Sequence, residues 1–276
     1  MTYLEKKYYP NVGQSFGIAG ILIAGMIIMS PLTIILYKFV GKDASMLIYY
    51  LFAMGIPFWI VYTIRKRKTG NAKFNFRIEN KRIIPFVIIS TIALLIGVMY
   101  PLAELMMVLI PMPEMLKESF AMNPNLIIFL MIVVSAPILE ELIFRGIILD
   151  GQLNNKSPIT AILISSILFA FVHLNPWQFI SALFLGVLSG WVYYKTRNIS
   201  LSIIIHATNN FAGFLIMFVS EKNYGLDKSA MKGMTLIESY GGLTNFVLIT
   251  VGAILIFAVS THFLRKKLII VENACC

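Results

Sequence analysis

The sequence predicts an all-α fold, a polytopic transmembrane helical bundle of about eight spans. Two properties predict it: 58% of the 276 residues are hydrophobic and only 13% are charged. Soluble domains carry about a quarter charged residues, so this chain cannot cover a surface that faces water. Because the apolar segments run almost from end to end, we expect a single membrane domain over residues 1–276.

The apolar segments define the expected spans, since a helix needs about 20 apolar residues to cross a bilayer. They are residues 14–40, 46–63, 83–110, 125–149, 158–174, 177–194, 201–219 and 243–263. Ionisable residues lie inside or beside the fourth and fifth of these. In the sixth, Gly186 and Gly190 are four residues apart, which predicts close contact with a neighbouring helix.

The net charge of +10 is carried mostly by short loops between the apolar segments. Lys and Arg are enriched in loops on the cytoplasmic side of a membrane. With this rule the chain is an integral protein of the plasma membrane with both termini cytoplasmic, and its partner is the lipid bilayer rather than nucleic acid. The basic run Arg65–Lys68 is expected beside anionic headgroups. The adjacent Cys275 and Cys276 predict neither a disulfide framework nor a thiolate metal site.

Ionisable residues inside membrane spans cost free energy and usually mark function. Few residues of this kind occur here: Glu104, Glu140, Glu141, Arg145, His173 and His206, with the polar Asn210 beside them. All but the first lie in the second half of the chain, on three different expected spans. We therefore expect the chemistry in this half.

Two adjacent carboxylates lie in the fourth expected span, in the sequence Glu140-Glu141-Leu-Ile-Phe-Arg145. Glu141 and Arg145 are four residues apart, so they share a helix face and can form an ion pair. Glu140 points about 100° away around the helix and cannot share this partner well. We expect Arg145 to position Glu141, and Glu140 to act as a general base. The alternative is a structural ion pair that joins two helices.

The histidines of the next polar segments are also part of four-residue spacings. Phe169 precedes His173, and His206 precedes Asn210, by four residues, so each pair shares a helix face. Taken alone, His173 would be an interfacial histidine, and His206 with Asn210 an interhelical hydrogen bond. Combined with Glu140, they provide a base for water, a group to orient it and donors for an oxyanion, which indicates hydrolysis.

Other signatures of intramembrane proteases are missing from the sequence. There is no His-Glu-x-x-His zinc motif. The segment Gly186–Gly190 resembles a rhomboid serine site around Ser189 only superficially, because Val187 stands where glycine is required. Asp150 has no partner aspartate in another span, which argues against a presenilin-like pair of aspartates.

Three short motifs follow one another on consecutive polar-bearing spans: Glu140-Glu141-x-x-x-Arg145, Phe169-x-x-x-His173 and His206-x-x-x-Asn210. In this order they resemble the CAAX-processing and bacteriocin-processing protease family (CPBP, also called Abi), over residues 125–215. The resemblance implies an intramembrane endopeptidase. Its substrate would be a membrane-associated protein or peptide, in CAAX-type or bacteriocin processing.

The resemblance also implies the catalytic roles. Glu140 and His173 would activate the attacking water, and His206 and Asn210 would stabilise the oxyanion. A metallo-type reading stays open, because Glu140, His173 and His206 could form a zinc site with an open position for water. We favour a glutamic-type site without a cofactor, because Asn210 beside His206 suits an oxyanion site better than a metal shell.

The supporting residues implied by the resemblance are Glu141 and Arg145, which would hold the site in shape, and Phe169, which would pack beside His173. One conflict remains. Straight helices place His206 about 9 Å and His173 about 24 Å from the inner ends of their spans. A tilted or broken helix, or different boundaries around residues 150–176, would be needed to bring them together.

Two other classes of function stay open on the sequence. A non-catalytic membrane scaffold or immunity protein could keep the protease fold, although it would not need every polar group in lipid. A transporter or channel could use the same groups as a proton path. We see no symmetry between Gly/Pro-broken segments of the two halves, which a transporter of that kind would show.

Overall fold

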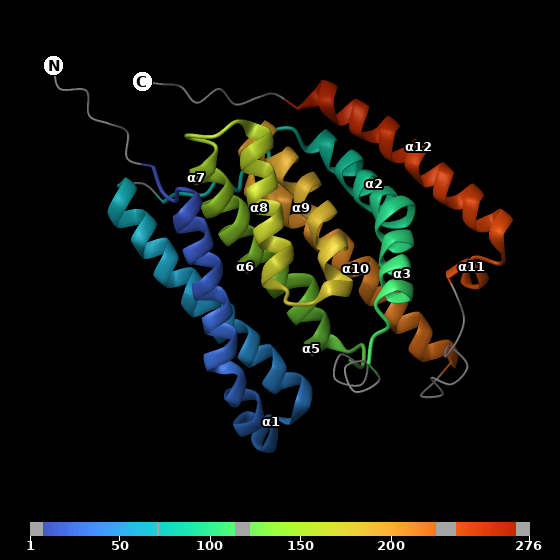
Figure 1. Ribbon diagram of the computed structural model, residues 1–276, viewed down its shortest axis with the longest axis horizontal. Coiled ribbons are helices and arrows are strands. Elements are labelled where there is room, and N and C mark those ends of the chain that lie inside the picture. The colour runs from blue at the N-terminus through green and yellow to red at the C-terminus, as the bar shows by residue number, and fades with distance from the viewer. Residues whose placement is uncertain (1–7, 71, 114–121, 225–235, 269–276) are drawn as a thin grey trace.

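A computed structural model of the chain describes residues 8–70, 72–113, 122–224 and 236–268, and the predicted Cys275 and Cys276 lie outside them (Figure 1). Its regular elements are all helical within these ranges. In chain order they are α1 (Val12–Thr69), η1 (Lys81–Ile83), α2 (Ile84–Leu94), η2 (Leu95–Met99), α3 (Tyr100–Leu109), α5 (Leu126–Phe129), η3 (Leu130–Ser135), α6 (Ala136–Ile143), η4 (Phe144–Leu149), α7 (Asp150–Gln152), α8 (Pro158–Val172), α9 (Pro176–Thr196), α10 (Ile199–Tyr224), α11 (Leu236–Ser239) and α12 (Leu243–Lys267).

The first two expected spans are the two arms of α1. Gly41 has a φ of 78°, which breaks the helix and reverses the chain, and glycine adopts this conformation without the steric cost of a side chain. The arms form a hairpin on one side of the bundle (Figure 1). They approach closely at Gly25, where an added Cβ would lie 2.6 Å from the Pro57 ring.

The predicted all-α membrane fold is confirmed, but the count of eight full spans is not. In the described part of the chain, five helical segments are long and apolar enough to cross a membrane: Val12–Thr69, Lys81–Leu109, Leu126–Gln152, Ile199–Val219 and Leu243–Lys267. The first of them contains both arms of α1. In contrast, α8 has only 15 residues, or about 22 Å, against a hydrocarbon core of about 30 Å.

Packing around α8 and α9 forms the centre of the bundle, with α10 beside them and α12 outside on α2 (Figure 1). The expected close contact of Gly186 and Gly190 is confirmed. A Cβ on Gly186 would lie 2.9 Å from the Cβ of Ser166, and one on Gly190 would lie 3.2 Å from Ile162. These glycines therefore let α9 lie directly against α8.

We expect Gly186→Ala to destabilise the folded protein by about 1–3 kcal/mol, because the added methyl group overpacks the contact with Ser166. Gly252→Ala on α12 is the matched control, since an added Cβ there meets nothing within 4 Å. Thermal unfolding of both variants in detergent measures the difference. Equal melting temperatures would show that the contact is not close-packed in the membrane protein.

Three π-helical turns, η2, η3 and η4, interrupt the helices of the third and fourth expected spans. A π turn is a local departure from the α-helical bonding pattern, and such turns are frequent at functional sites. Carbonyl groups at membrane depth must find partners within the protein. Here the carbonyl of Ile132 accepts from Asn210, that of Phe144 accepts from Ser165, and that of Gly146 accepts from Arg65. Side chains of other helices thus stabilise the irregular turns.

The expected position of Arg65 beside lipid headgroups is wrong. Arg65 is buried, and its guanidinium donates to Asp150 Oδ2 at 2.7 Å. Arg197 and Tyr193 both donate to Asp150 Oδ1 at 3.0 Å. Asp150 therefore joins the end of α1 to the end of α9. Because Arg65 is buried, its guanidinium pairs with this carboxylate instead of remaining in contact with water and headgroups.

Candidate active site

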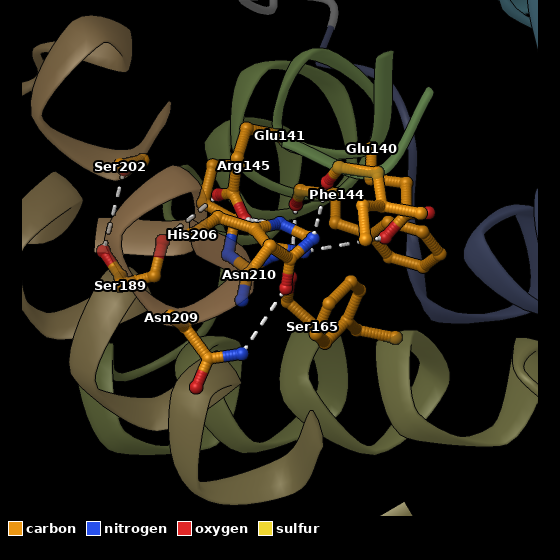
Figure 2. A network of polar contacts seen from close by, with 12 residues as sticks. Glu140, Glu141, Phe144, Arg145, Ser165, Ser189, Ser202, His206, Asn209 and Asn210 are labelled. Carbon is orange, nitrogen blue, oxygen red and sulfur yellow. Dashed lines mark hydrogen bonds and ion pairs between the residues drawn. The ribbon is translucent and has the colours of Figure 1, made fainter. Parts of the chain in front are cut away.

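Three of the residues singled out by sequence meet at one point of the bundle. Glu140 of α6 lies with its Oε2 atom 4.0 Å from Nε2 of His173, the residue that caps the end of α8. The same oxygen lies 3.9 Å from Nε2 of His206 on α10, and Figure 2 shows Glu140 and His206 facing each other. All three side chains are largely withdrawn from the surface, and Glu140 is 9% exposed.

The conflict between the depths of His173 and His206 disappears in this arrangement. The conflict arises only if α8 and α10 begin at the same membrane surface and run straight across. The shared contact with Glu140 shows that they do not. Glu140 itself lies ten residues before Asp150, about 15 Å along the helix.

Glu141 is the centre of a second, fully buried network (Figure 2). Its Oε1 accepts from Arg145 Nη1 at 2.9 Å and lies 3.0 Å from Nδ1 of His206. Its Oε2 accepts from the hydroxyl of Ser189 at 2.8 Å. Glu141 and Arg145 form the pair that their spacing allows, and the same carboxylate also fixes the ring of His206. Ser189 thus has a partner that the comparison with rhomboid sites did not suggest.

Phe169 packs against both histidines and against Arg145. Its ring centroid lies 4.9 Å from that of His173 and 5.5 Å from that of His206. The guanidinium carbon of Arg145 lies 4.6 Å from the same centroid, in the geometry of a cation–π contact. Because one ring contacts all three groups, Phe169 fixes their relative positions.

The protonation pattern of both imidazoles follows from their partners. Nδ1 of His173 lies 2.8 Å from the carbonyl oxygen of Phe169, and a carbonyl can only accept, so this nitrogen carries the hydrogen. Nδ1 of His206 faces the Glu141 carboxylate in the same way. When either ring is neutral, its Nε2 therefore presents a lone pair toward Glu140.

Two hydrogen bonds orient the side chain of Asn210, which lies on α10. Its Nδ2 donates to the carbonyl of Ile132 at 2.7 Å, and its Oδ1 accepts from Asn209 Nδ2 at 3.1 Å. An amide nitrogen has two hydrogens, so Asn210 keeps one for a further acceptor. Asn210 lines the same cavity as Glu140 and His206.

Comparison with protein families gives a match over part of the chain. Residues 122–212 match the family model described as Rce1-like, type II CAAX prenyl endopeptidase. This segment is therefore similar to the CAAX protease family. The match includes Glu140, His173, His206 and Asn210, and it leaves out α1 and α12.

The chain is also similar to several bacterial proteins. The uncharacterized protein YyaK of Bacillus subtilis is 31% identical over 229 residues, which are 74% of this chain and 65% of YyaK. The membrane-embedded CAAX protease MroQ of Staphylococcus aureus is 36% identical over 103 residues, 34% of this chain and 39% of MroQ. The chain thus spans about two fifths to two thirds of the length of these relatives, and no solved structure gives a significant match.

Two cavities of the chain meet at Glu140 and His173. The main cavity, of about 470 Å³, lies between η2, η3, α6, α9 and α10 and also contains His206 and Asn210. The side pocket, of about 160 Å³, lies between α1, η4 and α8. Tyr50, Glu140 and His173 line both and therefore stand at the boundary between them.

Tyr50 belongs to the candidate site, although no sequence pattern separates it from other tyrosines. Its hydroxyl donates to Glu140 Oε1 at 2.6 Å from the second arm of α1. The other oxygen of Glu140, Oε2, is buried and has no hydrogen-bond partner in the protein. Tyr50 therefore orients the carboxylate so that Oε2 faces the two histidines.

We expect Tyr50→Phe to lower turnover about tenfold with little change in KM, because a hydrogen bond to a charged group contributes about 1.5–3 kcal/mol. Tyr49→Phe is the matched control, since the Tyr49 hydroxyl donates to the Met26 carbonyl instead. Peptide cleavage by the reconstituted variants measures both constants. Equal turnover of the two variants would exclude Tyr50 from the positioning of Glu140.

Proposed function

We propose that this chain is an intramembrane endopeptidase in which Glu140 and His173 activate water, and His206 and Asn210 stabilise the oxyanion. One observation carries the proposal. A buried carboxylate oxygen of Glu140 without a hydrogen-bond partner faces two imidazole nitrogens at about 4 Å, and Glu140 lines a cavity of the helical bundle. Buried polar atoms usually have a partner, so such an atom marks a site for a small polar molecule.

The first step of the proposed reaction is the attack of water. A water molecule within hydrogen-bond distance of Glu140 Oε2 and His173 Nε2 would donate one hydrogen to each and keep a lone pair free. As its oxygen bonds to the peptide carbonyl carbon, one proton moves to Glu140, which acts as general base. Tyr50 keeps Glu140 in place during this transfer.

The second step is the collapse of the tetrahedral intermediate. Its oxyanion would accept from the remaining amide hydrogen of Asn210 and from Nε2 of His206 in the protonated ring. The positive charge on that ring would lie beside Glu141, whose carboxylate is 3.0 Å from Nδ1. When the C–N bond breaks, Glu140 returns its proton to the leaving nitrogen, so the products are a carboxylic acid and an amine. The acid then ionises to a carboxylate.

Zinc is the alternative cofactor, with Glu140, His173 and His206 as ligands. The donor types fit zinc, and both Nδ1 atoms are held by an oxygen, as is usual for histidine ligands. Among the described residues, no three His, Cys, Asp or Glu are grouped as metal ligands. A bound zinc would supply an activated hydroxide. We propose the metal-free, glutamic-type reaction, which predicts that exhaustive chelation leaves activity unchanged.

The proposed substrate is a peptide or a membrane-anchored protein, because the main cavity lies within the bilayer-spanning part of the chain. We further propose a plasma-membrane location with both termini cytoplasmic. The last turns of α1 and α12 carry the basic residues Lys66, Arg67, Lys68, Arg265, Lys266 and Lys267. Cytoplasmic ends of membrane helices are enriched in such residues.

The experiment is a comparison of peptide termini in membrane fractions from cells with the native chain or Glu140→Gln. Gln keeps the shape of the side chain but removes the base, so a defined set of termini is expected to disappear. Glu104→Gln is the control, because Glu104 lines neither cavity. Identical termini at equal protein levels would reject proteolysis and favour the scaffold or immunity protein.

A further inference from the structure

The side pocket shares Glu140 and His173 with the main cavity but contains neither of the proposed oxyanion groups. His206 and Asn210 line the main cavity only, whereas Met26, Met54 and Phe144 line the side pocket only. A peptide bond placed between Glu140 and Asn210 therefore lies at the mouth of this pocket. A side chain next to that bond can enter it.

The walls of the side pocket are apolar. They are formed by Met26 and Met54 of α1, Phe144 of η4, and Phe169 and Val172 of α8. Four of these five side chains are buried, and Met26 is partly exposed. The polar groups that line it are those at the boundary, namely Tyr50, Glu140 and His173. A charged or amide side chain would lose its hydration there without a partner of its own.

The volume of the pocket limits what it can hold. An apolar cavity of about 150 Å³ binds one benzene molecule, and the side pocket has about 160 Å³. One aromatic or branched aliphatic side chain therefore fills it, and a much larger group such as an isoprenoid chain does not fit. Met26 and Met54 can adapt to different shapes, because methionine is flexible and polarisable.

We propose that the side pocket is a specificity pocket that takes one large apolar side chain, of the Leu, Met or Phe class, from a residue flanking the cleaved bond. This inference rests on the proposed function for the position of that bond. The pocket adds a preference for one type of substrate side chain, which the catalytic residues alone do not provide. It also gives part of the selection to Met26 and Met54 of α1, which lies outside the part of the chain matched by the family model.

The test is a peptide library in lipid vesicles in which each residue flanking the cleaved bond is varied. For the reconstituted native chain, Leu, Met or Phe at one flanking position is expected to exceed Ala by about 10–200-fold in kcat/KM, and Asp or Lys to fail there. Met54→Phe partly fills the pocket and is expected to shift the preference toward Ala. Leu51→Phe is the matched control on the same arm, where Leu51 is 43% exposed and lines neither cavity.

Binding of the same peptides to Glu140→Gln separates the two proposals, because binding needs no cleavage. Cleavage without a preference at either flanking position, or the same preference in Met54→Phe and Leu51→Phe, overturns the specificity pocket and leaves the protease. A binding preference that Met54→Phe removes, without any cleavage by the native chain, supports the pocket and overturns the proposed activity.

Discussion

Glu140→Gln is expected to lower the turnover of the purified, reconstituted protein about 10²–10⁴-fold, the usual contribution of a general base. The substitution should leave the stability of the fold nearly unchanged. The Tyr50 hydroxyl can still donate to the side-chain oxygen of Gln, and Oε2 has no partner to lose. Cleavage of a fluorogenic peptide and thermal unfolding of the same preparations measure the two effects.

The adjacent carboxylate provides the contrast. Glu141→Gln removes the charge that pairs with Arg145 and faces His206, so both stability and turnover are expected to fall. The difference between the two variants separates a residue that acts on substrate from one that positions other residues. Turnover of Glu140→Gln within a few fold of the native value would falsify the assignment of the base.

Arg145→Met is expected to destabilise the protein by about 3–5 kcal/mol, the cost of breaking a buried ion pair by removing one partner. Both Arg145 and Glu141 are fully buried, so the remaining carboxylate would stay in the protein interior without its cation. Met fills much of the volume of Arg and keeps contact with Phe169. Chemical unfolding in detergent, followed by tryptophan fluorescence, measures the loss.

The double variant Glu141→Gln with Arg145→Met tests the reason for that loss. It leaves neither charge behind, and it is expected to be more stable than Arg145→Met alone. If the two variants are equally unstable, the loss comes from the packing of Arg145 on Phe169 rather than from the isolated charge of Glu141.

Most of the fold could be predicted, because hydropathy shows which segments enter the membrane. The boundary between two spans at Gly41 could also be predicted, because the first expected span ends at residue 40 and the second begins at residue 46. Hydropathy does not show how each helix crosses. The 15 residues of α8 were counted as a full span, although helices that pack inside a bundle need not cross the whole bilayer.

The candidate site was predictable where its residues share a helix face, and less so where they come from distant segments. The spacing of Glu141 and Arg145 is local, and the structure contains that ion pair. Tyr50 and Glu140 are 90 residues apart in the chain, and no local pattern links them. Arg65 was expected at the headgroups because its neighbours are basic, but its partner Asp150 comes from another helix.

The π turns η3 and η4 lie on either side of α6, the helix that carries Glu140 and Glu141. They allow the number of residues around these carboxylates to change without moving the carboxylates. A π turn takes up one inserted residue locally, so the helix before and after it keeps its direction and phase. In an uninterrupted α-helix, one inserted residue would rotate everything beyond it by about 100°. Homologous chains that differ by one residue within 130–135 or 144–149 can therefore place the two carboxylates identically, and a search for such homologues should allow these single-residue gaps.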